Sequence, residues 1–369
     1  MDKSVNLLFL KRKLKTAGVI LIVWVLAGAM TAIYEYLFLT NFPGIIFAEE
    51  MQGYSFTNSL IAAMLWALLG GSMFCIIELF YLQNKLENQS FIKVVGIKMI
   101  IYFIMLLFIN LLTSAFYNSV TFDQPFFSED VWLRVRVFSS SLSFWHPLLP
   151  FILILATTLF LIQINYKFGQ GELWKYILGK YFNPREEKRI FMFLDISSST
   201  TIAEQLGHVK FFHFINDFYK DITNDILINL GDIVDYVGDE IIVSWTLQNG
   251  IHEARCIQCF FDIKKKVKLL SDTYQEKYGI QPHFRAGIHV GEATIGEIGK
   301  IKKEITYFGD VMNTTSRIQG ITKEKGEELV ISEAVMNLLP ENSFKMNGLG
   351  DIQLRGKKSN TRVYGVRFD

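Results

Sequence analysis

Four long apolar runs in the first half of the chain limit what this half can fold into. They cover approximately Ala17–Leu39, Ser59–Leu82, Val94–Leu112 and Leu148–Ile164, and each is near the length of about 20 residues that a membrane-spanning helix needs. Half of the 369 residues are hydrophobic and the mean hydropathy is +0.26, values that are high for a soluble protein. The sequence therefore predicts an α-helical membrane domain of four transmembrane helices over residues 17–164, embedded in a lipid bilayer.

Basic residues around these runs predict the orientation in the membrane. Four lie within the six residues before the first run, none lies in the segment 40–58, and others follow the second and fourth runs: Lys11, Arg12, Lys13, Lys15, Lys85, Lys93 and Lys167. Cytoplasmic loops carry an excess of Lys and Arg, so residues 1–16 are expected to be a cytoplasmic N-terminus, and four crossings return the C-terminal half to the cytoplasm. We therefore expect a multi-pass protein of the inner (plasma) membrane. The net charge of +1 provides no basic surplus for nucleic acid.

Polar residues in the apolar half have two interpretations. Glu78 and Lys98 are expected at similar depth near the cytoplasmic face, where they either pair or extend separately to the interface. Long charged side chains commonly extend to the interface, so the second interpretation is favoured. The segment around Asp123 and Arg134 is expected to be an outer loop.

Three cysteines are too few for a disulfide framework. Cys256 and Cys259 have the spacing of a redox or zinc pair, but their surroundings predict a helix and no second ligand pair follows. Two reduced thiols on one helical face are the favoured interpretation.

The composition changes after the fourth run. Residues 165–188 are mixed and charged, with Gly and Pro breaks, which predicts a helical linker, and residues 189–369 alternate strand and helix patterns, which predicts one domain of mixed α and β structure. Within it, "RIFMFLDISSST" is expected to be a strand ending at Asp195, followed by a helix. A carboxylate at a strand end beside free helix amides suits a metal and a phosphate, although alone it is better explained as an ordinary helix cap.

A second acidic residue is expected to join Asp195. In "VDYVGDEIIVSW", Gly238 and Asp239 separate two strand-like stretches and predict a hairpin. A hairpin tip beside the strand that ends at Asp195 brings the two carboxylates into one pocket. Mg²⁺ with substrate phosphates is the usual partner of such a pair.

A third element predicts polar groups on one helix face. "EITYFGDVMNTTSRIQG" ends in a helical pattern in which Asn313 and Arg317 are four residues apart. Such groups suit a ribose and an anionic transition state, although alone they are better explained as a solvated face.

Together these stretches resemble the class III nucleotidyl cyclases, the adenylate and guanylate cyclase catalytic domains. The resemblance covers nearly all of residues 189–369 and rests on "FLDISSST", "YVGDEIIVSW", "FRAGIHVGEATIG" and "TYFGDVMNTTSR" in that order. It implies a ferredoxin-like α+β catalytic domain that cyclises a nucleoside triphosphate. It also implies that Asp195, the Ile196 carbonyl and Asp239 hold two Mg²⁺ or Mn²⁺ ions.

The same resemblance implies roles for further residues. The amides of Ser198, Ser199 and Thr200 would bind phosphates, Asn313 would orient the ribose, and Arg317 would stabilise charge on the phosphorus. One of Arg355, Lys357 and Lys358 would meet the outer phosphates. In this family the metal ligands and the Asn and Arg come from different subunits, which implies a homodimer with two equivalent sites.

The sequence departs from the family pattern where the base is read. Most adenylate cyclases have Lys and guanylate cyclases usually have Glu at the position of Asp235, and Thr306 occupies the second base-reading position, as in some bacterial adenylate cyclases. An ionised Asp accepts hydrogen bonds only, which favours guanine, whereas Thr306 resembles the adenylate pattern. An adenylate cyclase is favoured. A guanylate cyclase and a non-catalytic membrane signalling protein stay open.

Overall fold

The computed structural model describes residues 3–41, 55–82, 85–86, 89–140, 142–145, 148–169, 172–340, 344–352 and 360–367. The chain forms two compact units, Met1–Trp174 and Lys175–Asp369, and each is described by itself.

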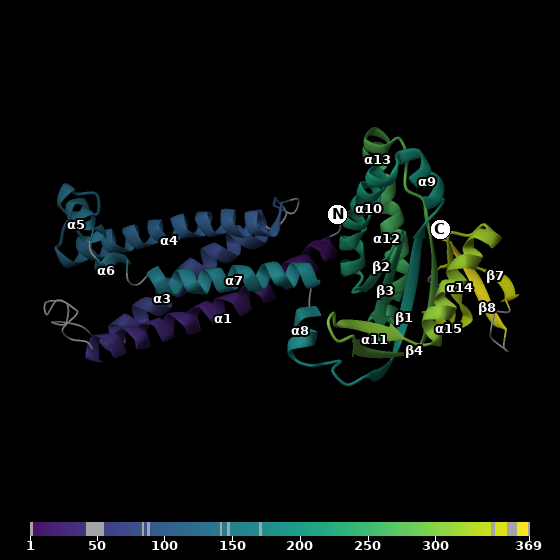
Figure 1. The fold of residues 1–369 in the computed structure, drawn as a ribbon, viewed down its shortest axis with the longest axis horizontal. Coiled ribbons are helices and arrows are strands. Elements are labelled where there is room, and N and C mark those ends of the chain that lie inside the picture. The colour runs from purple at the N-terminus through teal and green to yellow at the C-terminus, as the bar shows by residue number, and fades with distance from the viewer. Residues whose placement is uncertain are drawn as a thin grey trace. The chain divides into compact units, whose positions relative to one another are not determined.

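The first unit consists of helices. Its long ones are α1 (Lys3–Asn41), α3 (Phe56–Ile76), which continues as the π-helical segment η1 (Ile77–Leu82), α4 (Phe91–Thr121) and α7 (Leu148–Phe168) (Figure 1). Within them, Lys13–Leu37, Phe56–Leu82, Phe91–Val120 and Leu148–Asn165 are long and apolar enough to cross a membrane. The prediction of four such helices is confirmed, and the third is longer than expected.

The segment predicted as an outer loop is partly helical. Helix α5 (Glu129–Ser139) and helix α6 (Leu142–Trp145) lie between α4 and α7 in the chain. The Ser128 hydroxyl accepts a hydrogen bond from the Val131 amide and caps α5. Val131 and Val135 are buried with Ala115 of α4. The loop prediction failed because these two valines, one turn apart, have a partner on α4.

Glu78 and Lys98 form a buried ion pair. The Lys98 Nζ lies 2.5 Å from Glu78 Oε1, both side chains are at most 2% exposed, and the Tyr102 hydroxyl donates to Glu78 Oε2 at 2.7 Å. The favoured interpretation, in which each side chain extends separately to the interface, is therefore wrong. Two opposite charges on neighbouring helices satisfy each other at lower cost than two separate ones at this depth.

The linker is shorter than predicted. It contains α8 (Glu172–Ile177), and strand β1 (Arg185–Ile196) begins before the expected boundary at residue 189. Residues 185–188 pair with strand β4 (Phe284–Ile298), opposite Ile295 to Glu292. The charged side chains of "REEK" obscured this strand, because most of them are exposed.

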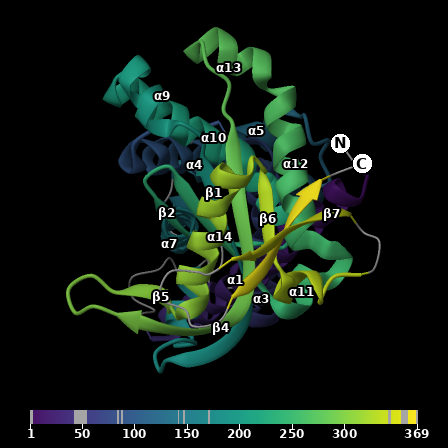
Figure 2. The ribbon, with the colours of Figure 1, turned by 90° about the vertical axis from the view of Figure 1, so that its right-hand side faces the viewer.

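An eight-stranded sheet organises the second unit, in the order β2-β3-β1-β4-β6-β8-β7, with β5 paired to β4. The other strands are β2 (Asp232–Val237), β3 (Glu240–Thr246), β4 (Phe284–Ile298), β5 (Glu304–Phe308), β6 (Leu329–Ser332), β7 (Lys345–Ile352) and β8 (Thr361–Arg367). Figure 2 shows the β4–β5 hairpin at one end of this sheet.

Helices cover both faces of the sheet. They are α9 (Ser199–Leu206), α10 (His208–Ile228), α11 (Leu247–Ile251), η2 (His252–Ala254), α12 (Arg255–Leu269), α13 (Ser271–Tyr278), α14 (Asp310–Lys325) and α15 (Glu333–Met336). The first four strands and the helices α10 and α12 follow the order β-α-β-β-α-β of ferredoxin-like domains. The predicted α+β fold is confirmed.

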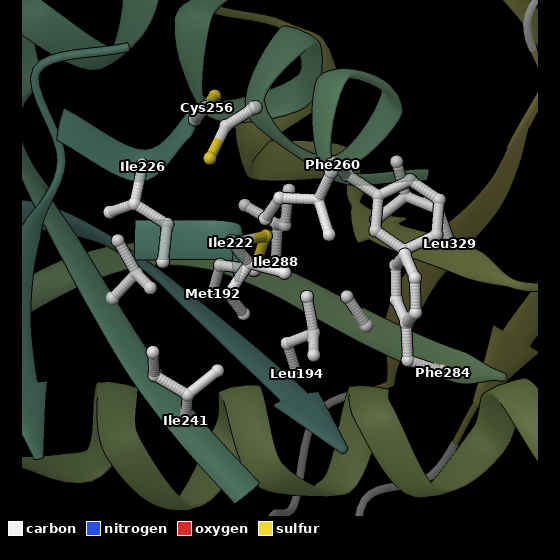
Figure 3. Close-up of a cluster of buried hydrophobic side chains, with 14 of the residues drawn as sticks. Met192, Leu194, Ile222, Ile226, Ile241, Cys256, Phe260, Phe284, Ile288 and Leu329 are labelled. Atoms are coloured by element: carbon white, nitrogen blue, oxygen red, sulfur yellow. The ribbon is translucent and has the colours of Figure 1, made fainter. Parts of the chain in front are cut away.

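Strand β1 is buried on both sides, which explains its nearly continuous apolar sequence. Ile190, Met192 and Leu194 face the main core with α10 and α12, part of which Figure 3 shows. Phe191 and Phe193 face the opposite side, where Val311 of α14 packs. Asp195, near the end of β1, is therefore carried by a strand that is packed on both faces.

The two cysteines of α12 belong to the main core. Cys256 and Cys259 are free and buried, and burial raises the pKa of the Cys256 thiol to about 12. Thiols with so high a pKa are poor nucleophiles and poor metal ligands. The interpretation as two reduced thiols on one helical face agrees with this environment.

The buried ion pair of the first unit gives a testable prediction. Replacing Lys98 with Met leaves Glu78 without its cation, which should destabilise the protein by about 3–5 kcal/mol. The double variant Glu78→Gln/Lys98→Met should recover most of this loss. The measurement is the thermal midpoint of the detergent-purified protein. Lys15→Met, at an exposed position of α1, is the matched control and should change little. Equal losses in the single and double variants would contradict the pair.

Candidate active site

Asp195 occupies the end of the central strand. It is half-buried, and it lies opposite Glu240 of β3 on one side and Arg285 of β4 on the other. Antiparallel pairing in both directions fixes the backbone here. The carboxyl group is thus held in place before any ligand binds.

The hairpin between β2 and β3 brings a second carboxyl group to the same place. Gly238 has a φ of +67° at the first position of a two-residue turn, where glycine is favoured. The Ile196 amide donates to the Asp239 carbonyl oxygen at 3.4 Å, and the Asp239 carboxyl group lies close enough for its charge to raise the pKa of Asp195. The Tyr219 hydroxyl of α10 supports the tip by donating to the Gly238 carbonyl at 3.1 Å. The expected meeting of the two aspartates therefore occurs within one chain.

The electrostatics of this corner favour a cation. Burial, followed by the adjoining Asp239, raises the pKa of Asp195 to about 7, although Gln319 and Arg285 act in the opposite direction. Burial and the charges of Asp195 and Asp239 raise the pKa of Glu240 to about 7. Two neighbouring carboxylates repel each other, and a bound cation would offset this repulsion. Their hard oxygen donors fit Mg²⁺ or Mn²⁺.

The protein side chains alone do not complete a metal site. In the described part of the chain, no group of three or more His, Cys, Asp or Glu side chains has a metal-binding arrangement. Asp195 and Asp239 are two donors, and the backbone at Ile196 adjoins both of them. Mg²⁺ typically takes one or two carboxylates and completes its shell with water and substrate phosphates, so a pair is sufficient for this type of site.

Helix α9 begins directly behind the aspartates. Ser198 occupies the position before the helix with a φ of 60° and without a side-chain capping bond, so the interpretation of its hydroxyl as an ordinary cap is wrong. Ser198 and Thr200 are exposed, and Ser199 is half-buried. The first amides of α9 therefore adjoin the acidic corner, which is formed by Asp195 and Asp239, and a cation-bound phosphate there would approach these amides.

Helix α14 presents two different faces. One packs on the sheet through Val311, Thr315 and Ile318, which are buried, and a Cβ added to Gly287 of β4 would lie only 2.3 Å from the Gln319 amide nitrogen. The absence of a side chain at Gly287 thus lets α14 lie directly on β4. Asn313 is exposed and Arg317 half-buried.

The residue of α14 that meets Asp195 is Gln319. Its Nε2 donates to Asp195 Oδ2 at 3.3 Å. An α-helix turns by about 100° per residue, so Arg317 and Asn313 project from α14 roughly 160° and roughly 120° away from Gln319. Asn313 and Arg317 are therefore not brought to the acidic corner of their own chain.

Asp235 and Thr306 lie on different strands. Asp235 follows a bulge in β2, is exposed, and accepts a hydrogen bond from the Tyr236 amide at 2.8 Å. The ion-pair partner Glu304, and to a smaller extent the charge of Asp235, raises the pKa of Lys302 in the β4–β5 turn. Thr306 is half-buried and pairs with Gly296 across the β4–β5 hairpin. Arg355, Lys357 and Lys358 lie outside the described residues.

Comparison with known proteins identifies the second unit. The sequence profile of the family "Adenylate and Guanylate cyclase catalytic domain" matches residues 183–367, half of the chain. The chain belongs to this family.

Relatives and solved structures agree with this assignment. Adenylate cyclase 2 of Rhizobium meliloti (strain 1021) is 30% identical to the chain over 209 residues, which are 56% of this chain and 58% of that protein. The adenylate cyclase of Anabaena cylindrica is 29% identical over 184 residues, 48% of this chain and 36% of that one. A bacterial light-regulated adenylyl cyclase structure shares the fold, with a TM-score of 0.52, 20% identity, and coverage of 62% of this chain and 66% of that one.

Sequence reasoning missed three residues that adjoin the acidic corner of the cyclase domain. Glu240 and Arg285 flank Asp195 in the strand register, and Gln319 reaches it from α14. Glu240 could have been found from the sequence, because it is the third acidic residue of the stretch "VDYVGDEIIVSW". Arg285 and Gln319 carry no local signal, because only the sheet register and the packing of α14 bring them to Asp195.

The raised pKa values of the acidic corner give a prediction for metal binding. Without metal, Asp195 and Glu240 bind protons more tightly in the folded than in the unfolded cyclase, so their contribution to stability falls as pH rises from about 4 to about 7. Mn²⁺ competes with these protons. It should therefore raise the thermal midpoint of the purified full-length protein more at pH 8 than at pH 6.

The variant Asp239→Asn is the control for this experiment. It keeps the size of the side chain but removes one charged donor, and it should abolish the Mn²⁺-dependent shift at both pH values. A shift that persists in this variant, or one that is equal at both pH values, would contradict the assignment of the two aspartates.

Proposed function

We propose that the protein is a membrane-anchored nucleotidyl cyclase that converts ATP to 3′,5′-cyclic AMP and pyrophosphate at the interface of a homodimer. The observation that carries this proposal is the division of groups within one chain. The acidic corner is assembled on β1 and the β2–β3 hairpin, whereas the α14 residue that meets Asp195 is Gln319, and Asn313 and Arg317 project from other sides of this helix.

Each element has a part in the proposed reaction. Asp195, Asp239 and the Ile196 carbonyl would hold two divalent cations, which would lower the pKa of the ribose 3′-hydroxyl and offset phosphate charge. The amides of Ser198, Ser199 and Thr200 hold phosphate oxygens. The 3′-oxygen then attacks the α-phosphorus in line, the bond to the pyrophosphate oxygen breaks, and the hydroxyl proton is released.

The second copy supplies the groups that the acidic corner lacks. Asn313 of the second copy orients the ribose, and Arg317 stabilises the charge on the phosphorus. A head-to-tail dimer presents α14 of each copy to the acidic corner of the other, which creates two equivalent sites. One of Arg355, Lys357 and Lys358 meets the outer phosphates.

ATP is the favoured substrate. The relatives named adenylate cyclase support it, and the Thr306 hydroxyl suits the adenine amino group as an acceptor. GTP is the second candidate, because the exposed carboxylate of Asp235 accepts hydrogen bonds such as those of guanine N1–H and N2–H. A chain that binds nucleotide without turnover would be a non-catalytic signalling protein.

The apolar helices anchor the enzyme in this proposal. The basic residues before the first span and after the fourth place both ends of the membrane half, and with them the cyclase domain, in the cytoplasm of a cell whose inner (plasma) membrane holds the protein. ATP and GTP are supplied on that side.

The substrate prediction is tested with purified full-length protein and Mn²⁺. ATP, GTP, CTP and UTP are offered separately, and the products are identified by mass. Cyclic AMP from ATP is the expected result, and Asp195→Asn should reduce its formation by at least about 100-fold, because the reaction depends on charge stabilisation at this corner. Cyclic GMP as the main product would show that GTP, and not ATP, is the preferred substrate. No product from any of the four would contradict an active cyclase.

The shared site predicts complementation between inactive variants. Asp195→Asn and Arg317→Ala should each be inactive alone, but their co-expression should restore up to about a quarter of the wild-type activity, because half of the random dimers are mixed and each of these has one intact site. Co-expression of Asp195→Asn with Asp239→Asn is the control and should restore nothing, since both changes affect the same half-site. Failure of the first pair to complement would contradict the interface.

A further inference from the structure

Two strands that carry the candidate base-reading residues are not paired with each other. Strand β2 carries Asp235 and pairs with β3, whereas β5 carries Thr306 and pairs with β4. A site that reads a base needs its polar groups held to within about 0.5 Å. Strands β3, β1 and β4 stand between β2 and β5 in the same sheet, so a side-chain contact that reaches across β1 would restrict their separation further than the backbone ladder does.

Arg189 lies between these strands. Its side chain projects from β1, is 3% exposed, and donates from three nitrogens. Nη2 bonds to Asp232 Oδ2 of β2 at 2.8 Å, Nε to Ser244 Oγ of β3 at 2.7 Å, and Nη1 to Glu187 Oε2 at 3.1 Å. The planar guanidinium fork thus fixes the direction of β2 relative to β1 and β3.

The same guanidinium reaches β5. Its Cζ lies 5.7 Å from the ring centroid of Tyr307, which is within the range of a cation–π contact, and Phe191 meets the same ring edge-to-face at 5.9 Å. Tyr307 directly follows Thr306 in the chain. Its ring therefore ties the backbone at Thr306 to β1.

The apolar residues beside these contacts bring the two strands to one cluster. Val234, next to Asp235, and Tyr307, next to Thr306, both pack on Phe191, Phe193 and Ile242. Apolar packing holds the strands against the same cluster, but it is not directional and does not prevent one strand from sliding along another. The buried guanidinium adds direction to these contacts, because its planar fork fixes the geometry of its hydrogen bonds.

We propose that Arg189 is a positioning residue for base selection, which sets the separation of Asp235 and Thr306 by holding Asp232 on β2 and Tyr307 on β5. This inference rests on the proposed function and deepens it. It identifies the hydrogen-bonding edge of a purine base as the group that this arrangement selects, and it assigns both base-reading strands to one copy of the chain.

The test compares ATP with GTP in full-length protein, measuring kcat and KM for both. Asp232→Asn removes the charged partner on β2, at a side chain that is 48% exposed, and Tyr307→Leu removes the ring on β5. Each variant should lower the ratio of kcat/KM for the preferred purine nucleotide to kcat/KM for the other one by about tenfold. The change should come mainly from a higher KM for the preferred nucleotide, because a displacement of about 1 Å in a site can lower the rate on the order of 100-fold. The Mn²⁺ concentration for half-maximal activity should not change.

Two further variants separate positioning from general stability. Arg189→Lys keeps the charge and loses the fork, and it should lower the ratio in the same direction. Asp217→Asn removes the ion-pair partner of Lys277 between α10 and α13, away from both strands, and should leave the ratio unchanged. If Asp232→Asn and Tyr307→Leu change only the thermal midpoint, or lower kcat equally for both purines, the inference is overturned.

The outcome is distinguishable from a failure of the proposed function. If the wild-type protein forms no cyclic product from either nucleotide, the cyclase assignment fails, and the ratio of the Kd values for ATP and GTP then replaces the kinetic ratio. A Kd ratio that falls in the same two variants supports the positioning role. Absence of binding to both nucleotides in the wild-type protein overturns this inference as well.

Discussion

The contact between Asp195 and Asp239 is the constraint on which the catalytic half depends. Two carboxyl groups that repel each other when ionised are held together by strand pairing, since β1 pairs with β3 and the hairpin returns Asp239 to the end of β1. Burial and the neighbouring acids raise the pKa values of Asp195 and Glu240, which means that the ionised forms of both side chains are unfavourable in this arrangement. A corner that is unfavourable without a cation gains most when one binds.

The position of α14 follows from the same sheet. Gly287 lets the helix backbone approach β4 closely, and this contact turns Gln319 toward Asp195 while Asn313 and Arg317 stay on the outer side. One copy of the chain therefore holds an acidic corner and a separate polar helix face. Activity that requires both groups at one phosphorus would couple turnover to dimerisation, and a change in the association of two copies would then control the rate.

The sequence was informative where a local pattern had one physical solution. The four apolar runs, the Gly238–Asp239 hairpin and the strand that ends at Asp195 were predicted correctly, because length, turn chemistry and periodicity are local properties. It was less informative where a partner was remote. For Glu78 and Lys98, separate extension to the interface was favoured over pairing, and the segment of α5 was expected to be a loop, because in both cases the deciding neighbour lies on another helix.

The residues of the site divide in the same way. The sequence alone determined four apolar helices and a cyclase catalytic domain, and its ordered motifs selected Asp195, Asp239, Asn313 and Arg317 as candidate site residues. Only the tertiary structure decided that Arg285 and Gln319 adjoin Asp195, that Arg189 joins β2 to the ring on β5, and that α14 turns its polar face away from the aspartates. The physical reason is that sheet register and helix packing are set by contacts between distant parts of the chain, and no local stretch encodes them.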